Sequence, residues 1–246
     1  MNKMKSPGII FVAFIVGVFS GQGLTQAANF SFTSSSGSTS GNGLGNSVVR
    51  TDDGVTVTAT GWSLSNVSTS SFQAGQIRLW GTGMGVCNAG EGTGCGNPQH
   101  PVDNIGYTDF LLFTFSKSVL LSSAFLTAWA SDFDATLWAG STPLNLDQQT
   151  LAGAGLNVGA IESTYNGPAN AGSTTRTINL SSSFSDPVNW FLIGASINNN
   201  DYGDSFKFKT LTVSVPTENA VPEPMTAILL GTGLMGLIAA KRFMKT

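Results

Sequence analysis

Aspartates in turns are the residues of this sequence with the most specific chemistry. Asp132 and Asp134 are two residues apart, Asp201 and Asp204 lie in an Asn-rich turn, and Asp103 is a fifth candidate. Carboxylates at such short spacing can reach one hard cation, and Ca²⁺ prefers carboxylate and carbonyl oxygens. The pattern is not an EF-hand loop, and acidic turn residues often only cap backbone amides. Both interpretations stay open, with Ca²⁺ as the one candidate cofactor.

Catalysis has little support. His100 is the sole histidine, and the chain has no Gly-x-Ser-x-Gly elbow and no His-Glu-x-x-His zinc motif. A surface-loop histidine is favoured over a general base. The enzymatic alternative is a glycosidase, which needs two carboxylates about 5–9 Å apart in a sugar cleft. We predict that the protein is not an enzyme and has no catalytic residues.

The two cysteines, Cys87 and Cys95, lie in a glycine-rich loop. In an oxidising compartment such a pair most simply forms a structural disulfide. A reactive thiol pair is the alternative, but the loop offers no basic neighbour that would lower a thiol pKa.

Tryptophans raise a second function class, a lectin-like carbohydrate-binding module, because sugar faces stack on indole rings. Trp62, Trp80 and Trp138 are the candidates, although most tryptophans here lie in apolar runs typical of a core. Two or more in an exposed row would favour binding, whereas five buried tryptophans would favour a scaffold.

The elements that must position these residues are predicted to be strands. Residues 55–60 alternate apolar and polar side chains, and further short β-rich runs follow, separated by turn residues; two of these runs are 110–115 and 119–129. In the last run the apolar face changes side near Thr210, which predicts a β-bulge there. These patterns indicate an all-β domain, a single β-sandwich of about seven strands that is jelly-roll-like. The Ser- and Gly-rich residues 28–47 fit either a flexible lead-in or an irregular first strand.

Both ends look like targeting segments. Lys3 and Lys5 precede a short apolar run and the small residues around Ala27, which describes a secretory signal peptide cleaved after Ala27. At the other end Pro222, Glu223 and Pro224 precede the apolar residues 225–240. Three basic residues then form the stop-transfer end: Lys241, Arg242 and Lys245.

This order of Pro-Glu-Pro, short membrane helix and basic terminus resembles the PEP-CTERM sorting signal, which is found on substrates of exosortase enzymes in bacteria that make exopolysaccharide. The resemblance implies that Pro222, Glu223 and Pro224 are recognised for processing. Residues 78–211 also resemble a group of exosortase-dependent surface proteins, through segments that include Trp80–Cys87, Val102–Asn104 and Asp132–Asp134.

Together these features predict an exported protein. It would be held in the inner membrane with its domain in the periplasm, then released to the cell surface or outside the cell, in association with exopolysaccharide or biofilm. Its partners would be the Sec translocon, signal peptidase, an exosortase-type enzyme and exopolysaccharide. The two ends hold five of the 11 basic residues and none of the 14 acidic ones, so the region between them is strongly acidic. An acidic domain does not attract the phosphate backbone, and nucleic acid is therefore excluded as a partner. The expected parts are 1–27 (signal peptide), 28–47 (lead-in), 48–216 (β-sandwich), 217–224 (linker), 225–240 (transmembrane helix) and 241–246 (cytoplasmic end).

Overall fold

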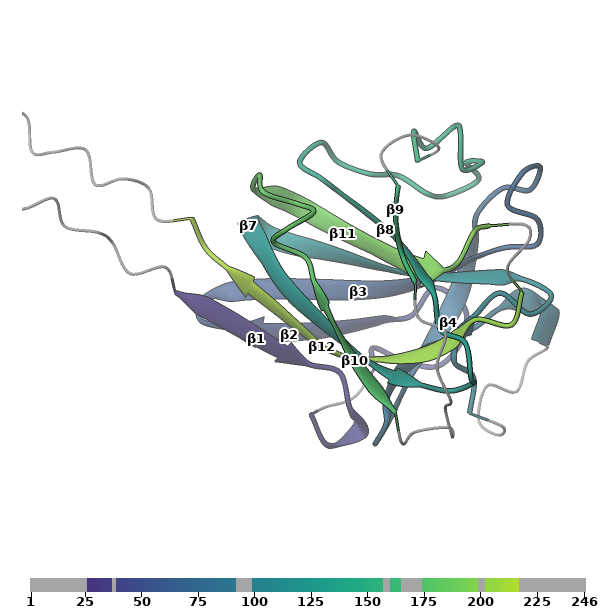
Figure 1. Cartoon of the computed structure of the whole chain (residues 1–246), viewed down its shortest axis with the longest axis horizontal. Coiled ribbons are helices and arrows are strands. Elements are labelled where there is room, and N and C mark those ends of the chain that lie inside the picture. Colours follow the sequence, from purple (N-terminus) through teal and green to yellow (C-terminus); the bar gives the residue numbers. More distant parts are fainter. Residues whose placement is uncertain are drawn as a thin grey trace, which may run out of the picture. The chain divides into compact units, whose positions relative to one another are not determined.

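The computed structural model describes residues 26–36, 39–91, 99–156, 160–164, 174–198 and 202–216. Within them the chain is all-β, as predicted, with twelve strands and two short 3-10 helices (Figure 1). The strands are β1 (Ala27–Ser31), β2 (Ser47–Asp52), β3 (Val55–Leu64), β4 (Gln73–Trp80), β5 (Gly83–Cys87), β6 (Val102–Asp103), β7 (Thr108–Ala128), β8 (Ala135–Gly140), β9 (Ile161–Ser163), β10 (Thr175–Asn179), β11 (Val188–Ala195) and β12 (Ser205–Ser214). The 3-10 helices are η1 (Ser34–Ser36) and η2 (Ala89–Glu91).

Both predicted targeting segments lie almost entirely in the part of the chain that the structure does not describe. The described residues contain no helix long and apolar enough to cross a membrane. Residues 1–25 and 217–246 lie outside the described part of the chain. The signal peptide, the Pro-Glu-Pro motif, the helix over 225–240 and the basic end therefore stay predictions.

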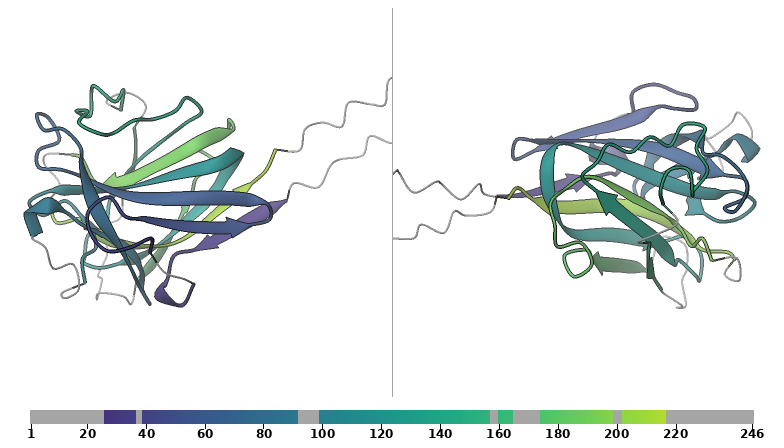
Figure 2. Two further views of the ribbon diagram at one scale, coloured as in Figure 1. Left: turned by 180° about the vertical axis from the view of Figure 1, so that it is seen from behind. Right: turned by 90° about the horizontal axis from the view of Figure 1, so that it is seen from above.

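All strands belong to one hydrogen-bonded sheet that curls back on itself (Figure 2). Five strands close into a ring in the order β12–β5–β4–β3–β7, because β12 pairs with both β5 and β7. The remaining strands add outside this ring: β1 and β6 pair with β12, β2 with β3, β10 and β11 with β7, and β8 and β9 follow β11. Closure protects several strand edges that would otherwise be open for pairing with other chains.

Strand β7 joins the two sides of the ring. Two strands were predicted in this region, at 110–115 and 119–129, but they are halves of one 21-residue strand. Its first half pairs with β3 and β11, and its second half pairs with β12 and β10. The polar residues Ser116, Lys117 and Ser118 suggested a turn, yet they are exposed positions at which the strand passes from one set of partners to the other.

The predicted bulge in β12 is confirmed. Phe208 pairs with Leu126 and Thr210 with Phe125, which leaves Lys209 as the extra residue. The bulge lets Phe208 and Leu211 both face the core although they differ in sequence parity. The alternation in β3 is also confirmed, with Val55, Val57 and Ala59 all fully buried.

A cluster of phenylalanines forms the centre of the main core. The side-chain rings of Phe113 in β7 and Phe208 in β12 lie 4.7 Å apart between centroids. Phe32 packs edge-on against both, at 5.3 and 5.8 Å. A second cluster covers the other face of β7, where Phe110 contacts Phe72 and Trp138. Residues 110–113 are buried on both faces, and for this reason their sequence is continuously apolar.

The folded domain begins earlier than residue 48. Of the two interpretations left open for residues 28–47, the first strand is correct for their beginning, since β1 pairs with β12 from Ala27↔Ser214 to Ser31↔Thr210. Phe30 and Phe32 are both buried in the main core. The Ser-rich composition concealed this strand because its apolar residues are few.

Candidate functional site

Three of the five predicted Ca²⁺ ligands lie together. Asp132 and Asp134 precede β8, and Asp204 immediately precedes β12. One carboxylate oxygen from each lies within 4.8 Å of the other two. Asp134 and Asp204 are buried, and Asp132 is partly buried. We call these three residues the aspartate cluster.

Backbone contacts hold the aspartate cluster in place. The Asp134 amide donates to Asp204 Oδ1 at 2.7 Å, and the Ser205 amide donates to the Asp132 carbonyl at 3.0 Å. The turn before Asp204 includes Gly203, whose φ of 106° is one that residues with a side chain rarely adopt. Two segments about 70 residues apart in sequence are thereby locked side by side.

The aspartate cluster fits a divalent cation with oxygen ligands. Within the part of the chain that the structure describes, Asp132 Oδ1 is a buried carboxylate oxygen without a hydrogen-bond partner, and such a group is costly unless something compensates it. Three carboxylates supply hard oxygens of the kind Ca²⁺ takes, and its usual six to eight ligands would be completed by carbonyls or water. Asp132, Asp134 and Asp204 are the residues that would hold the ion.

The other two predicted ligands are not in the cluster. Asp201 lies outside the described residues. Asp103, in β6, pairs with Ser205 of β12. Its carboxylate points elsewhere, because its Oδ1 accepts a hydrogen bond from the Ile105 amide at 3.0 Å. Asp103 belongs instead to a group of buried charges around Lys207.

Asn104 links the aspartate cluster to a surface pocket. Its Nδ2 donates to Asp204 Oδ2 at 2.9 Å and to the Ser196 carbonyl at 3.2 Å. Its Oδ1 accepts from the amides of Gly203 and Asp204 at 2.8 and 3.0 Å. The side chain of Asn104 therefore fixes the turn that carries Asp204, and it also forms part of the pocket wall.

The pocket has a volume of about 240 Å³. It is lined by Asn66, Val67, Asn104, Gly106, Thr108, Ser196, Ile197, Asn198 and Tyr202, and we call it the asparagine pocket. Tyr202 is 71% exposed, an unusual state for a large aromatic side chain. An aromatic side chain beside amide and hydroxyl groups is suited to binding a ligand with a hydroxylated ring, because such a ligand needs both an apolar contact and hydrogen bonds.

The tryptophans do not form the exposed row that carbohydrate stacking would need. Trp138 is 2% exposed and packs on Phe110, so its prediction as a sugar platform is wrong. Its indole N–H donates to the Leu156 carbonyl at 2.5 Å, which explains how a tryptophan can be buried at this position. Trp62 and Trp80 are each partly buried, and Trp80 covers Lys207.

Lys207 is fully buried in the wall of the domain. Its Nζ lies 3.4 Å from the ring centroid of Trp80 and 5.0 Å from that of Trp129, and it donates to the His100 carbonyl. Burial lowers the pKa of Lys207 to about 6, although the charges of Asp103 and Glu91 oppose this shift. A lysine enclosed in this way affects the stability of the fold and is not accessible to a ligand.

Two carboxylates near Lys207 also have altered acidity. Burial raises the pKa of Asp103 to about 7, with a smaller rise from Glu91 and opposing effects of the Ile105 amide and Lys207. Burial raises the pKa of Asp109 well above its ordinary value, and Asp103 adds to this rise. Asp109 is held by Asn88, whose Nδ2 donates to its Oδ1 at 3.1 Å.

His100 is partly buried instead of lying free in a surface loop. Its Nδ1 is 2.9 Å from Glu91 Oε1, and Glu91 Oε2 accepts from the Asn88 amide. This contact gives His100 a structural role at the base of its loop. Cys87 is buried at the end of β5, while Cys95 lies outside the described residues, so the disulfide stays a prediction.

Sequence reasoning did not identify the asparagine pocket. Asn66, Thr108 and Tyr202 come from three segments whose proximity no local pattern reveals. The Asn-rich stretch around residue 200 was the available signal, but it had been assigned only to cation binding.

Comparison with known proteins adds little to this picture. No protein-family model and no curated protein matches the chain. Among solved structures, a DUF4465 family protein from Bacteroides ovatus shows similarity at 8% sequence identity. The alignment covers 78% of this chain and 99% of that chain, with a TM-score of 0.32. A TM-score this low shows neither fold nor function.

Proposed function

We propose that this chain is an exported, non-enzymatic surface or matrix protein that is sorted by an exosortase-type enzyme and associated with exopolysaccharide. The observation that supports the proposal is the position of the two chain ends. The Val215 amide donates to the Gln26 carbonyl at 3.1 Å, so both ends leave the domain from one place. A signal peptide and a sorting tail could therefore hold the domain from the same side.

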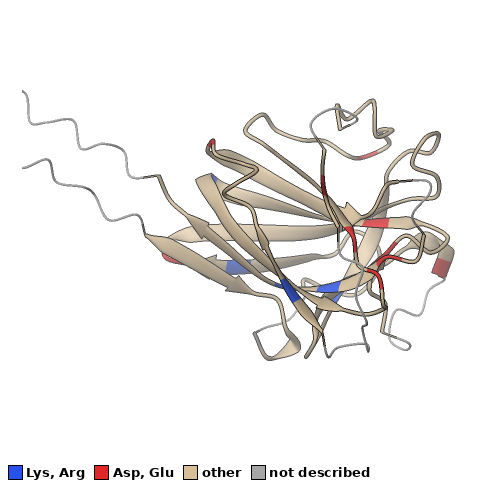
Figure 3. Cartoon of the chain, viewed as in Figure 1, with Lys and Arg blue, Asp and Glu red and all other residues tan. Residues whose placement is uncertain are grey.

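The aspartate cluster lies at the opposite end of β12 from this exit. Ten residues separate the two ends of the strand, about 30 Å at the usual rise per residue. Most acidic residues of the described domain gather toward that far end (Figure 3). The aspartate cluster and the asparagine pocket thus lie at the end of the domain that is far from Gln26 and Val215. We also propose that the curled sheet is a jelly-roll-like sandwich, with the phenylalanine core between its two layers.

Cleavage after Ala27 is compatible with this domain. It would leave Ala28 as the first residue, still paired with Val213 in β1. The buried residues Phe30 and Phe32 would remain in the mature protein.

Replacing Pro222, Glu223 and Pro224 with alanine tests the sorting proposal. In the producing cell we expect the wild-type protein to lose its C-terminal tail and the variant to stay full-length in the membrane fraction. Intact mass of the purified proteins gives the answer. Glu218→Ala, in the same linker but outside the motif, is the matched control and should be processed normally. Equal processing of the motif variant would contradict the proposal.

A lectin-like, Ca²⁺-dependent role is the second candidate, and Asn104 is the observation that favours it. One side chain both lines the asparagine pocket and donates to a carboxylate of the aspartate cluster. An ion bound by that cluster would stiffen the turn that carries Asp204 and Tyr202, and so shape the pocket. The cation would act by positioning residues, and this chain's own side chains would contact the sugar.

Tyr202→Ala tests this binding role. Residues 25–218 form a compact unit, so a fragment of residues 28–218 can be titrated with the producing organism's exopolysaccharide by calorimetry. With Ca²⁺ we expect saturable binding that the variant weakens about tenfold, or about 1.4 kcal/mol, through loss of the exposed ring. Leu44→Ala, at another exposed apolar residue, is the control. No binding with Ca²⁺ would reject the lectin role, and full binding with chelator would reject its dependence on Ca²⁺. Either result would leave the sorting proposal intact.

A further inference from the structure

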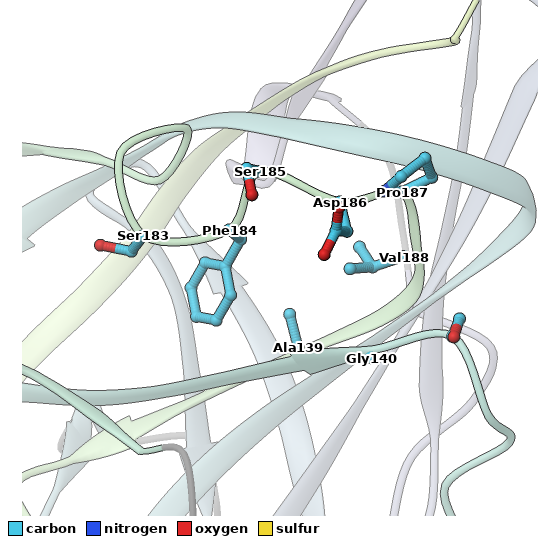
Figure 4. A pocket seen from close by; sticks show the side chains of 9 residues that line it. Ala139, Gly140, Ser183, Phe184, Ser185, Asp186, Pro187 and Val188 are labelled. Atoms are coloured by element: carbon cyan, nitrogen blue, oxygen red, sulfur yellow. The ribbon is translucent and has the colours of Figure 1, made fainter.

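A second pocket lies at the other end of β11. Its volume is about 290 Å³, and it is lined by Ala139, Gly140, Ser141, Ser183, Phe184, Ser185, Asp186, Pro187 and Val188. We call it the serine pocket. Figure 4 shows the Phe184 ring and the Asp186 carboxylate on one side of it, across from Ala139 and Gly140 of β8. Its size is close to the lower limit for small-molecule sites, roughly 300 Å³.

The walls of the serine pocket are fixed by the core. The ring of Phe184 packs edge-on against buried Phe191, with centroids 6.3 Å apart. On the opposite wall a side chain at Gly140 would collide with the Trp190 ring, since its Cβ would lie 2.6 Å from a ring carbon. Trp190 is itself held by a 2.6 Å hydrogen bond from Nε1 to the Thr142 carbonyl. Two walls of the pocket are therefore packed against other aromatic side chains of the domain.

The polar groups of the serine pocket are available to a ligand. Asp186, Ser183 and Ser185 are exposed, and within the described residues their side chains have no hydrogen-bond or salt-bridge partner. The pocket lining includes one carboxylate and no basic residue. It thus combines a negative charge, hydroxyl groups and one aromatic ring.

We propose that the serine pocket binds an amino-sugar unit with a free ammonium group. The Asp186 carboxylate pairs with the ammonium in a charge-assisted hydrogen bond. The Phe184 ring contacts the apolar face of the sugar, and the serine hydroxyls bond its hydroxyl groups. This inference goes beyond the proposed function and requires neither the aspartate cluster nor the sorting tail.

The position of the serine pocket would make the domain bivalent. Val188 at the start of β11 borders the serine pocket, and Ser196 just after its end borders the asparagine pocket. The length of β11, eight residues or about 25 Å, separates the two pockets. Two sites at opposite ends of one strand could contact two polysaccharide chains at once.

Titration of the isotope-labelled fragment 28–218 with D-glucosamine, N-acetyl-D-glucosamine and D-glucose, followed by NMR, tests the inference. We expect glucosamine to bind about tenfold more tightly than the two uncharged sugars and to shift the resonances of residues 183–188. Addition of chelator should leave this binding unchanged, which separates it from the Ca²⁺-dependent site. Equal affinities, or shifts confined to residues lining the asparagine pocket, would overturn the assignment.

Asp186→Asn removes the charge while keeping the size of the side chain. It should abolish the preference for glucosamine without changing the melting temperature. Phe184→Leu, which keeps an apolar residue against Phe191, should weaken all three sugars together. Asp147→Asn, at an exposed aspartate that does not line the pocket, is the control and should bind like the wild type. An unchanged preference in Asp186→Asn would reject the role of the carboxylate.

Discussion

Lys207→Met is expected to increase the stability of the domain at pH 6 and to lose that advantage steadily as the pH rises toward 9. Lys207 is fully buried, and burial lowers its pKa from the ordinary 10.5 to about 6. The unfolded chain binds a proton at this lysine more tightly than the folded domain does, so the lysine destabilises the fold. This destabilisation is complete below about pH 6 and disappears as the pH approaches 10.5.

The size of the effect follows from proton linkage. Between pH 6 and 10 the difference in unfolding free energy between variant and wild type should fall by about 1.4 kcal/mol per pH unit. Loss of the contacts with Trp80, Trp129 and the His100 carbonyl lowers the stability of the variant and offsets part of this gain. Urea unfolding of both proteins at several pH values measures the difference.

Two features make the lysine prediction specific. Asp103 has a pKa raised to about 7, so the folded domain binds this proton more tightly than the unfolded chain does. Its effect is therefore opposite to that of Lys207: stability falls as the pH rises from about 4 to 7. Measurements above pH 7 therefore leave out the titration of Asp103, and the comparison with the wild type cancels Asp109, which both proteins contain. Lys209→Met is the matched control, because Lys209 is also in β12 but is only partly buried. A difference for Lys207→Met that is constant with pH would contradict the assigned titration.

Calcium is expected to raise the melting temperature of the fragment 28–218 by about 5–10 °C. An ion at one hundred times its dissociation constant stabilises a folded protein by about 2.7 kcal/mol. For a domain of this size each kcal/mol corresponds to roughly 2–4 °C. Thermal unfolding with CaCl₂ and with chelator measures the shift, and an unchanged midpoint would count against a Ca²⁺ site.

Variants separate cation binding from ordinary structural roles. Asp204→Ala should cost about 2–4 kcal/mol even without calcium, because the Asp134 amide and Asn104 Nδ2 lose their acceptors in a buried place. Asp132→Asn should instead change the stability of the calcium-free domain little, because Asp132 Oδ1 has no hydrogen-bond partner within the described residues. It should also abolish the response to calcium. Asp147→Asn should respond like the wild type, and a normal calcium response in Asp132→Asn would reject the site.

Part of the site was predictable because it depends on residue chemistry. Asp132 and Asp134 are local in sequence, and oxygen ligands in turns suggest a hard cation without any knowledge of the fold. Their meeting with Asp204, and the exclusion of Asp103, depends on how β6, β8 and β12 come together. The serine and asparagine pockets likewise join segments that no spacing rule connects.

The sequence by itself determined the class of fold and several of its details, because side-chain alternation and phase are local properties of a strand. Alternation predicted β3, and the change of phase near Thr210 predicted the bulge of β12. Only the tertiary structure decided that 108–128 is one strand, that β1 begins the domain, and that Trp138 and Lys207 are buried. These outcomes depend on which distant strands pair and what covers each face, and such long-range packing leaves no periodic signal in the chain.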